Sequence, residues 1–173
     1  MKDISNSEDY LDVRDIIERF EELEEEREGL ASNVEEAKEA EAAAEIFYNE
    51  LDEPTEEAKE EAQGTWDYAQ VETSDARKAL EEWDDDYKDE LDTLGNLLSE
   101  LCGNGGDHQW KGDWYPVTLI RDSYFEESMD DMLEDIGAMP KDIPCYLTIT
   151  VDYDALKMDY TSVEFDGVTY WYR

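Results

Sequence analysis

The sequence is poor in positively charged residues. Its 173 residues include 14 Lys and Arg against 51 Asp and Glu, which gives a formal net charge of −37. Proteins that bind nucleic acid or an anionic membrane directly need a basic face, so this imbalance argues against both and favours a basic protein as the partner. No apolar run approaches membrane-spanning length, and the first residues lack the apolar segment of a signal peptide. We therefore expect a soluble, cytoplasmic protein.

Residues that commonly carry catalysis are also scarce. The one histidine, His108, lies among Gly and Asp, and a structural or solvated role is favoured over a ligand or catalytic role. Cys102 and Cys145 have no metal-ligand spacing, which favours reduced thiols over a disulfide or redox role. Asp84-Asp85-Asp86 and Asp130-Asp131 lack the turn glycine of a calcium loop. There is no phosphate-binding glycine loop or nucleophile elbow, so we expect no enzyme, cofactor or metal.

A sustained heptad pattern is present in the first hundred residues. It predicts two long helices, joined near residues 52–55, with Pro54 in the first turn of the second. The short connection makes the helices antiparallel. The expected contact positions a and d are Val13, Ile16, Phe20, Leu23, Arg27, Leu30, Val34, Ala37, Glu41, Ala44, Tyr48 and Leu51 in the first helix, and Ala62, Trp66, Ala69, Thr73, Ala76, Leu80, Trp83, Tyr87, Glu90, Leu94, Leu97 and Leu101 in the second.

The outward heptad positions b, c and f carry mostly carboxylates. We take these as the candidate partner-binding residues: Asp15, Glu18, Glu21, Glu22, Glu25, Glu28, Glu35, Glu36, Glu39, Glu57, Glu60, Glu61, Asp67, Asp75, Glu81, Glu82, Asp85, Asp89 and Asp92.

The charge of this segment approaches that of a nucleic acid. Residues 1–102 hold 36 acids and nine bases. About 45 helical residues form a rod of roughly 68 Å, so the excess amounts to one negative charge per about 2.5 Å, against about 1.7 Å in duplex DNA. Like charges this close lower the stability of a helix, and phosphate mimicry would explain why the sequence nevertheless contains so many. Solvation, as in halophilic proteins, and a generic acidic interaction arm remain alternatives.

Gly103-Asn104-Gly105-Gly106 ends the helical pattern and marks a change in composition. The expected domains are an acidic helical hairpin at residues 1–102, a Gly-rich linker at 103–106 and a small α+β domain at 107–173. The fold class is therefore α+β: a long N-terminal antiparallel helical hairpin, or coiled coil, followed by a small domain with an antiparallel sheet.

Several local signals organise the C-terminal domain. Residues 114–120 and 145–151 are strand-like, and the first of these contains Pro116. A capping box at Ser123 opens a helix that Gly137 closes, and this helix should cover one face of the sheet. Asp152 could cap a short helix. Two further strand-like runs, 162–165 and 168–172, flank Asp166-Gly167, which is a strong hairpin signal because both turn residues need positive φ.

Short motifs in this domain resemble a known protein family. They are Gly105-Gly106-Asp107-His108-Gln109-Trp110, residues 112–120, Ser123-Tyr124-Phe125, Glu134-Asp135-Ile136-Gly137, Met158-Asp159-Tyr160-Thr161 and residues 165–171. Over about residues 105–173 the chain resembles a domain of the ArdA-like antirestriction proteins. These are acidic, usually dimeric DNA mimics of phages and mobile elements that occupy the DNA-binding groove of type I restriction–modification enzymes.

The charge pattern and the resemblance lead to one functional expectation. It is an acidic DNA-mimic inhibitor, from a phage or mobile element, that occupies the DNA-binding groove of a bacterial defence enzyme in the host cytoplasm. The target would be a basic DNA-binding protein of a restriction–modification or CRISPR complex, with no direct nucleic-acid or membrane partner. Exposed seam or sheet-edge residues could form a homodimer. The alternative is a non-enzymatic acidic coiled-coil adaptor or scaffold whose charge only confers solubility.

Overall fold

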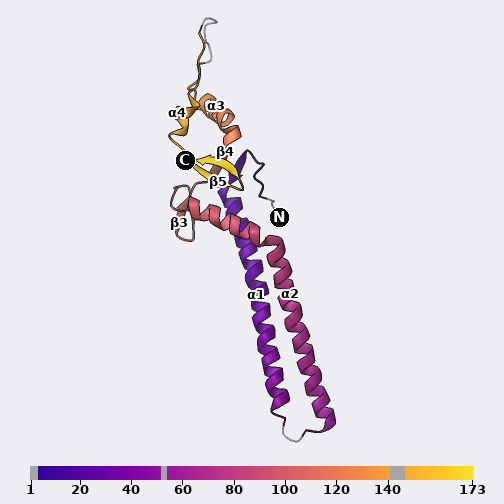
Figure 1. Cartoon of the computed structure of the whole chain (residues 1–173). Helices are drawn as coiled ribbons and strands as arrows, with labels where there is room; N and C mark the ends of the chain where they lie inside the picture. Colours follow the sequence, from indigo (N-terminus) through magenta and orange to yellow (C-terminus); the bar gives the residue numbers. More distant parts are fainter. Residues whose placement is uncertain (1–3, 52–53, 141–146) are drawn as a thin grey trace. The chain divides into compact units, whose positions relative to one another are not determined.

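Two long helices dominate the computed structural model, which describes residues 4–51, 54–140 and 147–173 (Figure 1). Helix α1 spans Val13–Asn49 and helix α2 spans Glu56–Leu101. The Tyr48 ring lies 5.4 Å from the Trp66 ring, and Arg27 Nε lies 2.7 Å from Asp84 Oδ1. Residue numbers rise along α1 as they fall along α2, so the helices pack antiparallel. A small antiparallel sheet follows them, which confirms the expected fold class.

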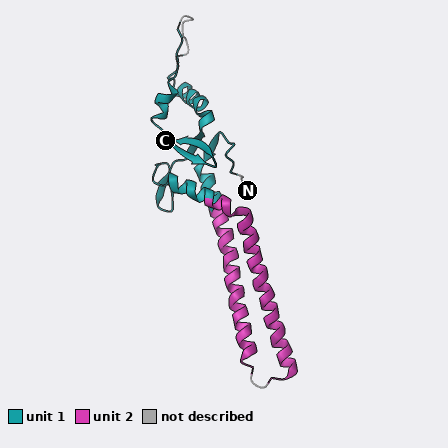
Figure 2. Ribbon diagram, viewed as in Figure 1, with its two compact units in different colours: residues 1–20, 93–173 teal, residues 21–92 magenta. Residues whose placement is uncertain are grey.

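The chain divides into two compact units (Figure 2). Unit 2 is residues 21–92, and unit 1 is residues 1–20 together with 93–173. This division differs from the expected one, which placed the boundary at Gly103–Gly106. The start of α1, up to residue 20, and the end of α2, from residue 93, belong to the same unit as the sheet. Both helix segments contribute buried residues to unit 1, among them Val13 and Leu101.

In unit 2 the heptad pattern describes the contact between the helices. Every expected a and d residue from Leu23 to Leu51 and from Ala62 to Tyr87 is buried or half-buried. Arg27, which interrupts the apolar seam, is paired with Asp84 of the opposite helix. Thr73 lies in the seam at 1% exposure, and its hydroxyl donates to the Ala69 carbonyl oxygen 3.0 Å away. Arg27 and Thr73 are therefore both hydrogen-bonded within the seam, whereas the buried indole N–H of Trp66 has no partner among the described residues.

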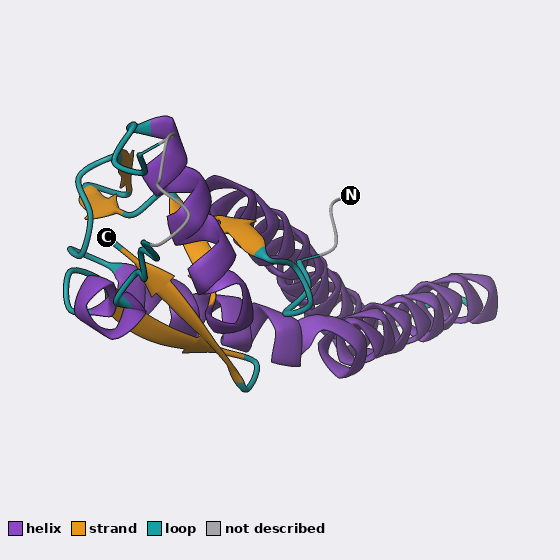
Figure 3. Cartoon of the chain, turned by 90° about the horizontal axis from the view of Figure 1, so that it is seen from above, coloured by secondary structure: helices purple, strands orange, loops and turns teal. Residues whose placement is uncertain are grey.

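Unit 1 contains all the strands of the described residues (Figure 3). A four-stranded antiparallel sheet has the order β1-β4-β6-β5. Its strands are Tyr10–Asp12, Thr118–Arg121, Val168–Tyr172 and Thr161–Phe165, in that order. Strand β1 was not expected, because residues 1–102 had been assigned to the helical hairpin. It pairs with β4 through Leu11 and Leu119.

Both faces of this sheet are covered within unit 1. On one face Ile120 packs with Phe125 and Met129 of helix α3, which spans Phe125–Asp135, and this confirms the expected helical cover. The opposite face presents the buried side chains of Leu11, Leu119, Tyr170 and Tyr172. The helix ends of the same unit also hold buried apolar residues: Val13, Ile16, Ile17, Leu94, Leu97, Leu98 and Leu101.

The glycine-rich segment after α2 is packed rather than free. Gly103 N–H donates to the Trp114 carbonyl oxygen at 2.9 Å. A Cβ atom on Gly105 would lie 2.2 Å from the Pro116 nitrogen, so only glycine fits there. The segment leads into a two-stranded ribbon of β2, His108–Trp110, and β3, Asp113–Tyr115. It therefore forms part of unit 1.

Pro116 divides the strand expected at residues 114–120. Strand β3 ends at Tyr115 and β4 begins at Thr118, and the two belong to different sheets. Proline has no N–H to donate to a ladder, so the pairing stops there. The strand expected at 145–151 is also absent from its described part, residues 147–151, while residues 145–146 lie outside the described residues.

Of three helix-boundary predictions, the end of α3 at Gly137 is confirmed, and the capping box at Ser123 and the position of Pro54 are wrong. Helix α3 ends as expected: Gly137 has a φ of 70°, and Ala138 N–H donates to the Leu133 carbonyl oxygen. The capping box at Ser123 does not form, because a 3-10 turn, η1 (Asp122–Tyr124), precedes the helix. Helix α1 is capped by Asp12, and α2 by Thr55, so Pro54 precedes the helix instead of opening it.

The last two C-terminal expectations are confirmed. Helix α4, Tyr153–Lys157, is capped by Asp152, whose Oδ1 accepts the Ala155 N–H at 3.0 Å. Asp166 and Gly167 both have positive φ in the turn between β5 and β6.

Candidate partner-binding surface

The heptad positions of the two helices place the candidate carboxylates outward. Of the nineteen, Asp15 is half-buried and all the others are exposed. They share this exposure because positions b, c and f lie opposite the a and d positions that hold the helices together. Asp15 and Glu18 lie in unit 1 and the remaining seventeen in unit 2. Unit 2 has 29 acidic and six basic residues, so its net charge is −23.

The acids of unit 2 are unevenly distributed. Residues 21–28 and 81–92 together hold fourteen acids and two bases, for a net charge of −12. We call these two segments the acidic patch. They face each other across the hairpin, because Arg27 pairs with Asp84, and the Trp83 indole N–H donates to Glu26 Oε2 at 3.2 Å. More than half of the charge of unit 2 is therefore gathered in fewer than a third of its residues.

One ion pair inside the acidic patch fixes its geometry. Arg27 Nε lies 2.7 Å from Asp84 Oδ1, and Nη2 lies 3.3 Å from Oδ2, which is a two-pronged contact. The hydrogen bond from Arg27 lowers the pKa of the Asp84 carboxyl, and the nearby Lys88 charge acts in the same direction. Asp84 is thus held at the seam, while the neighbouring Asp85 remains exposed at an outward position.

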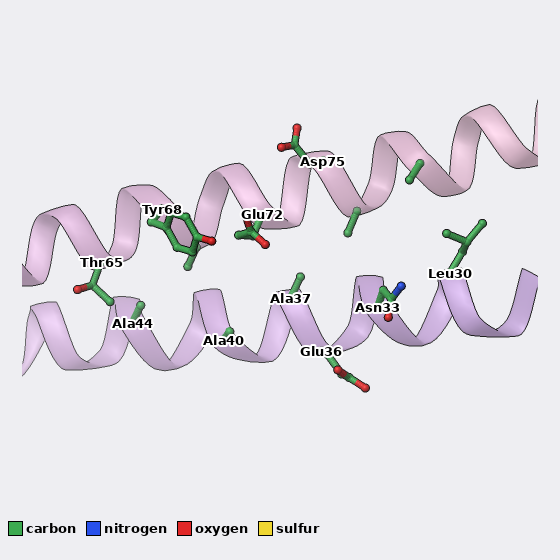
Figure 4. A pocket seen from close by; sticks show the side chains of 13 residues that line it. Leu30, Asn33, Glu36, Ala37, Ala40, Ala44, Thr65, Tyr68, Glu72 and Asp75 are labelled. Atoms are coloured by element: carbon green, nitrogen blue, oxygen red, sulfur yellow. The ribbon is translucent and has the colours of Figure 1, made fainter. Parts of the chain in front are cut away.

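The middle of unit 2 is less charged. Residues 29–44 and 62–80 hold seven acids and three bases, for a net charge of −4. Here the helices leave a groove of about 610 Å³ on one flank (Figure 4). Alanine forms much of its surface, as does the Tyr68 ring, and no Lys or Arg lines it. We call this the alanine groove.

Sequence reasoning did not identify the alanine groove as a site. Ala37, Ala44, Ala69 and Ala76 were expected as contact positions between the helices, and all four line the groove. The lining residues that sequence reasoning missed are Asn33, Ala40, Thr65, Tyr68, Glu72 and Ala79. Of these, Ala40 and Ala79 are small residues at the flanking heptad position g. A charged or long side chain is usual at g, so a small residue there on both helices was an available signal.

The third part of unit 2 is residues 45–61, which contain the end of α1, the connection and the start of α2. Residues 45–61 hold eight acids and one base, and Glu57, Glu60 and Glu61 are exposed. Asp52 and Glu53 lie outside the described residues.

The other candidate groups do not converge on a chemical site. His108 is half-buried in β2, opposite Tyr115 of β3. Asp130 Oδ1 accepts the Tyr153 hydroxyl at 2.7 Å. Cys102 is a free thiol, and Cys145 lies outside the described residues. Within residues 4–51, 54–140 and 147–173, no three His, Cys, Asp or Glu side chains are grouped as metal ligands.

Comparison with known proteins gives no relative for this chain: no protein-family model, curated protein or solved structure matches it. The ArdA-like resemblance therefore stays a prediction. None of the helices in the described part of the chain has the length and apolar character to cross a bilayer.

Proposed function

We propose that the protein is an acidic DNA mimic that inhibits a bacterial DNA-binding defence enzyme by occupying its DNA-binding groove. The observation that carries the proposal is the acidic patch, in which fourteen carboxylates and two bases are set on two facing helical segments. A basic groove that binds phosphates would bind such a surface through the same lysine and arginine side chains.

The charge density of the acidic patch supports mimicry more than that of the whole hairpin does. Residues 81–92 rise about 18 Å along the helix, so a net charge of −12 corresponds to one charge per about 1.5 Å. Duplex DNA carries one per about 1.7 Å. The patch would replace about five base pairs of phosphate backbone, and the less charged middle of the hairpin would contribute less.

The class of target rests on the ArdA-like resemblance and on the charge. A restriction–modification enzyme and a CRISPR effector both present a basic groove to DNA, and either would attract this surface over a long range at low salt. Binding should weaken steeply as salt rises, as it does for the DNA complex that is imitated.

Two matched triple variants test the proposal. Glu21→Gln with Glu22→Gln and Glu25→Gln neutralises positions b, c and f of one heptad of α1 inside the acidic patch. Glu35→Gln with Glu36→Gln and Glu39→Gln neutralises the same three positions two heptads later, outside it. Both remove three charges from one helix, so only the location differs.

The assay captures proteins from a bacterial lysate on the immobilised full-length chain and then adds duplex DNA. The expected result is a DNA-binding enzyme that DNA displaces, with capture weakened roughly tenfold or more by the first variant and little by the second. Equal weakening by both variants would contradict a role for the patch. A captured partner that DNA leaves bound would contradict mimicry.

The acidic adaptor is the second candidate, and the alanine groove is the observation that favours it. Duplex DNA presents no apolar groove of this kind, so mimicry alone does not account for it. An adaptor predicts a partner that DNA does not displace and that the first variant, which lies outside the alanine groove, leaves bound.

A further inference from the structure

The alanine groove is open on a helix pair whose surface is otherwise strongly charged. It extends along α1 from Leu30 to Ala44 and along α2 from Thr65 to Ala79. Each of these segments rises about 21 Å, or about four helical turns. A trough this long and narrow, bounded by two antiparallel helices, has the dimensions of a site for a third helix.

Large exposed apolar side chains lie beside the small ones. Tyr68 lines the groove and is 65% exposed. Phe47 is 59% exposed and occupies the same heptad position as Ala40, one heptad further along α1. Solubility and phosphate mimicry would both favour polar residues at these places. An exposed aromatic residue that lines a concave apolar surface, with a second aromatic residue one heptad beyond Ala40 on the other helix, is typical of a protein-docking site.

The charge around the groove decides which kind of helix fits it. Its polar lining residues include Glu36, Glu72 and Asp75, and none of the lining residues is basic. Glu36 and Asp75 point outward from opposite helices, one on each side of the groove (Figure 4). A second copy of the chain would bring its own acidic surface against these carboxylates. A helix with basic flanks would instead place its cations on both rims.

We propose that the alanine groove binds an amphipathic helix of a partner protein, with an apolar stripe flanked by Arg or Lys on both sides. Its apolar residues, spaced i, i+4, i+7 and i+11, lie over the alanines, and Tyr68 and Phe47 pack against its end. Basic side chains on either flank bind Glu36 on one rim and Asp75 on the other. The acidic patch is a separate surface, so this inference stands whether or not that patch imitates DNA.

The test uses the full-length chain and three labelled synthetic peptides of about eighteen residues. The first has leucine at i, i+4, i+7 and i+11 with arginine on both flanks. The second has the same composition in scrambled order, and the third has glutamate in place of arginine. Fluorescence anisotropy measures binding. Only the first peptide should bind tightly, with at least about a tenfold preference over the scrambled one, because charge without the apolar stripe is insufficient.

Matched variants locate the binding. Ala40→Gln with Ala79→Gln fills the groove at two exposed, helix-compatible positions and should weaken binding of the first peptide about tenfold or more. Ala42→Gln with Ala43→Gln makes the same change on exposed residues of α1 outside the groove and should leave binding unchanged. Circular dichroism establishes that both variants retain the helices.

A third variant keeps the test decisive if the groove-filling pair perturbs the hairpin. Glu36→Gln with Glu72→Gln and Asp75→Gln should weaken binding of the arginine peptide several-fold and reduce discrimination against the glutamate peptide. The inference is overturned if the scrambled peptide binds equally well, if both alanine pairs act alike, or if no peptide binds. It is also overturned if sedimentation finds a dimer that only the groove-filling pair dissociates, because the occupant would then be a second copy.

Discussion

At the scale of single residues, one cation, Arg27, links the two helices of unit 2. Arg27 occupies a contact position that would ordinarily be apolar, and it lies in a segment where six of eight residues are glutamate. Its guanidinium reaches Asp84 of the other helix, so it joins the two helices and offsets part of the repulsion between their acids. Arg27 is 41% and Asp84 28% exposed, and water therefore screens the pair substantially.

Arg27→Gln should lower the free energy of unfolding by about 0.5–1 kcal/mol at neutral pH. The pKa of Asp84 is lowered in the fold, so the stabilisation is complete above its ordinary value of 3.8 and is lost as the pH falls through the lowered pKa. Urea unfolding of the wild type, Arg27→Gln, Asp84→Asn and the double variant, at about pH 7 and about pH 2.5, measures the coupling. Coupling of equal size at both pH values would contradict the ion pair.

Two adjacent glycines offer a second residue-scale test. A Cβ atom at Gly105 would lie 2.2 Å from backbone atoms of Tyr115 and Pro116, whereas one at Gly106 would meet nothing within 4 Å. Gly105→Ala should therefore destabilise unit 1 by about 1–3 kcal/mol, because backbone has to move, and Gly106→Ala should be nearly neutral. Thermal unfolding followed by tryptophan fluorescence measures both. Similar effects from the two variants would mean that the segment is the linker that its composition suggested.

At the scale of elements, the long helices contain glycines that no packing requires. Gly29 and Gly64 are exposed, and an added Cβ would meet nothing within 4 Å at either position. Gly95 differs, because its Cβ would lie 3.1 Å from the Phe20 ring. Open positions and packed positions can therefore be told apart within the same pair of helices.

Gly29→Ala and Gly64→Ala should each stabilise the hairpin by about 0.5–1 kcal/mol, since alanine loses less backbone entropy in a helix. Gly95→Ala should gain less or lose stability, depending on whether the Phe20 ring can shift. Urea unfolding monitored by circular dichroism at the helical minimum provides the comparison. A loss of stability in both Gly29→Ala and Gly64→Ala would contradict the open space around these two positions.

The elements that the sequence predicted are those determined by local chemistry. The heptads predicted the buried seam, Asp166-Gly167 the turn, Gly137 the helix end and Asp152 the cap. Strand β1 was missed because its pairing with β4 lies more than a hundred positions away and leaves no local signal. Pro116 was recognised as a poor strand residue, but the sequence did not indicate that the chain would change sheets there. The heptads predicted that the carboxylates are exposed. The alanine groove depends on how closely α1 and α2 approach each other along one flank of the pair, and the heptads do not specify that distance.

At the scale of the whole molecule, charge and packing are distributed differently between the units. Unit 2 has a net charge of −23 over 72 residues, and unit 1 has −14 over 101 residues. Unit 2 is held by a single seam with several alanines, whereas unit 1 has a sheet covered on both faces. Electrostatic repulsion should therefore act more strongly on unit 2.

Added salt should stabilise unit 2 more than unit 1, because at roughly 0.1 M salt the repulsion between exposed charges more than about 10 Å apart is largely screened. Amide hydrogen exchange at low and at moderate ionic strength resolves the two units within one sample. Slower exchange with salt is expected mainly in residues 21–49 and 56–92. Uniform or absent slowing would contradict the assignment of strain to the acids.

Strand β1 also determines the order in which the protein can fold. Its partner β4 is made more than a hundred residues later, so the sheet is incomplete until most of the chain has left the ribosome. The contact between Arg27 and Asp84 spans 57 positions, fewer than the pairing of β1 with β4, so the helical hairpin can close first. That would leave residues 102–117 as the loop between the end of α2 and β4. Shortening the loop in this way reduces the entropic cost of pairing β1 with β4 by about 1.7 kcal/mol. We therefore expect the helical hairpin to act as a template for the sheet, so that variants which weaken the hairpin slow formation of the sheet.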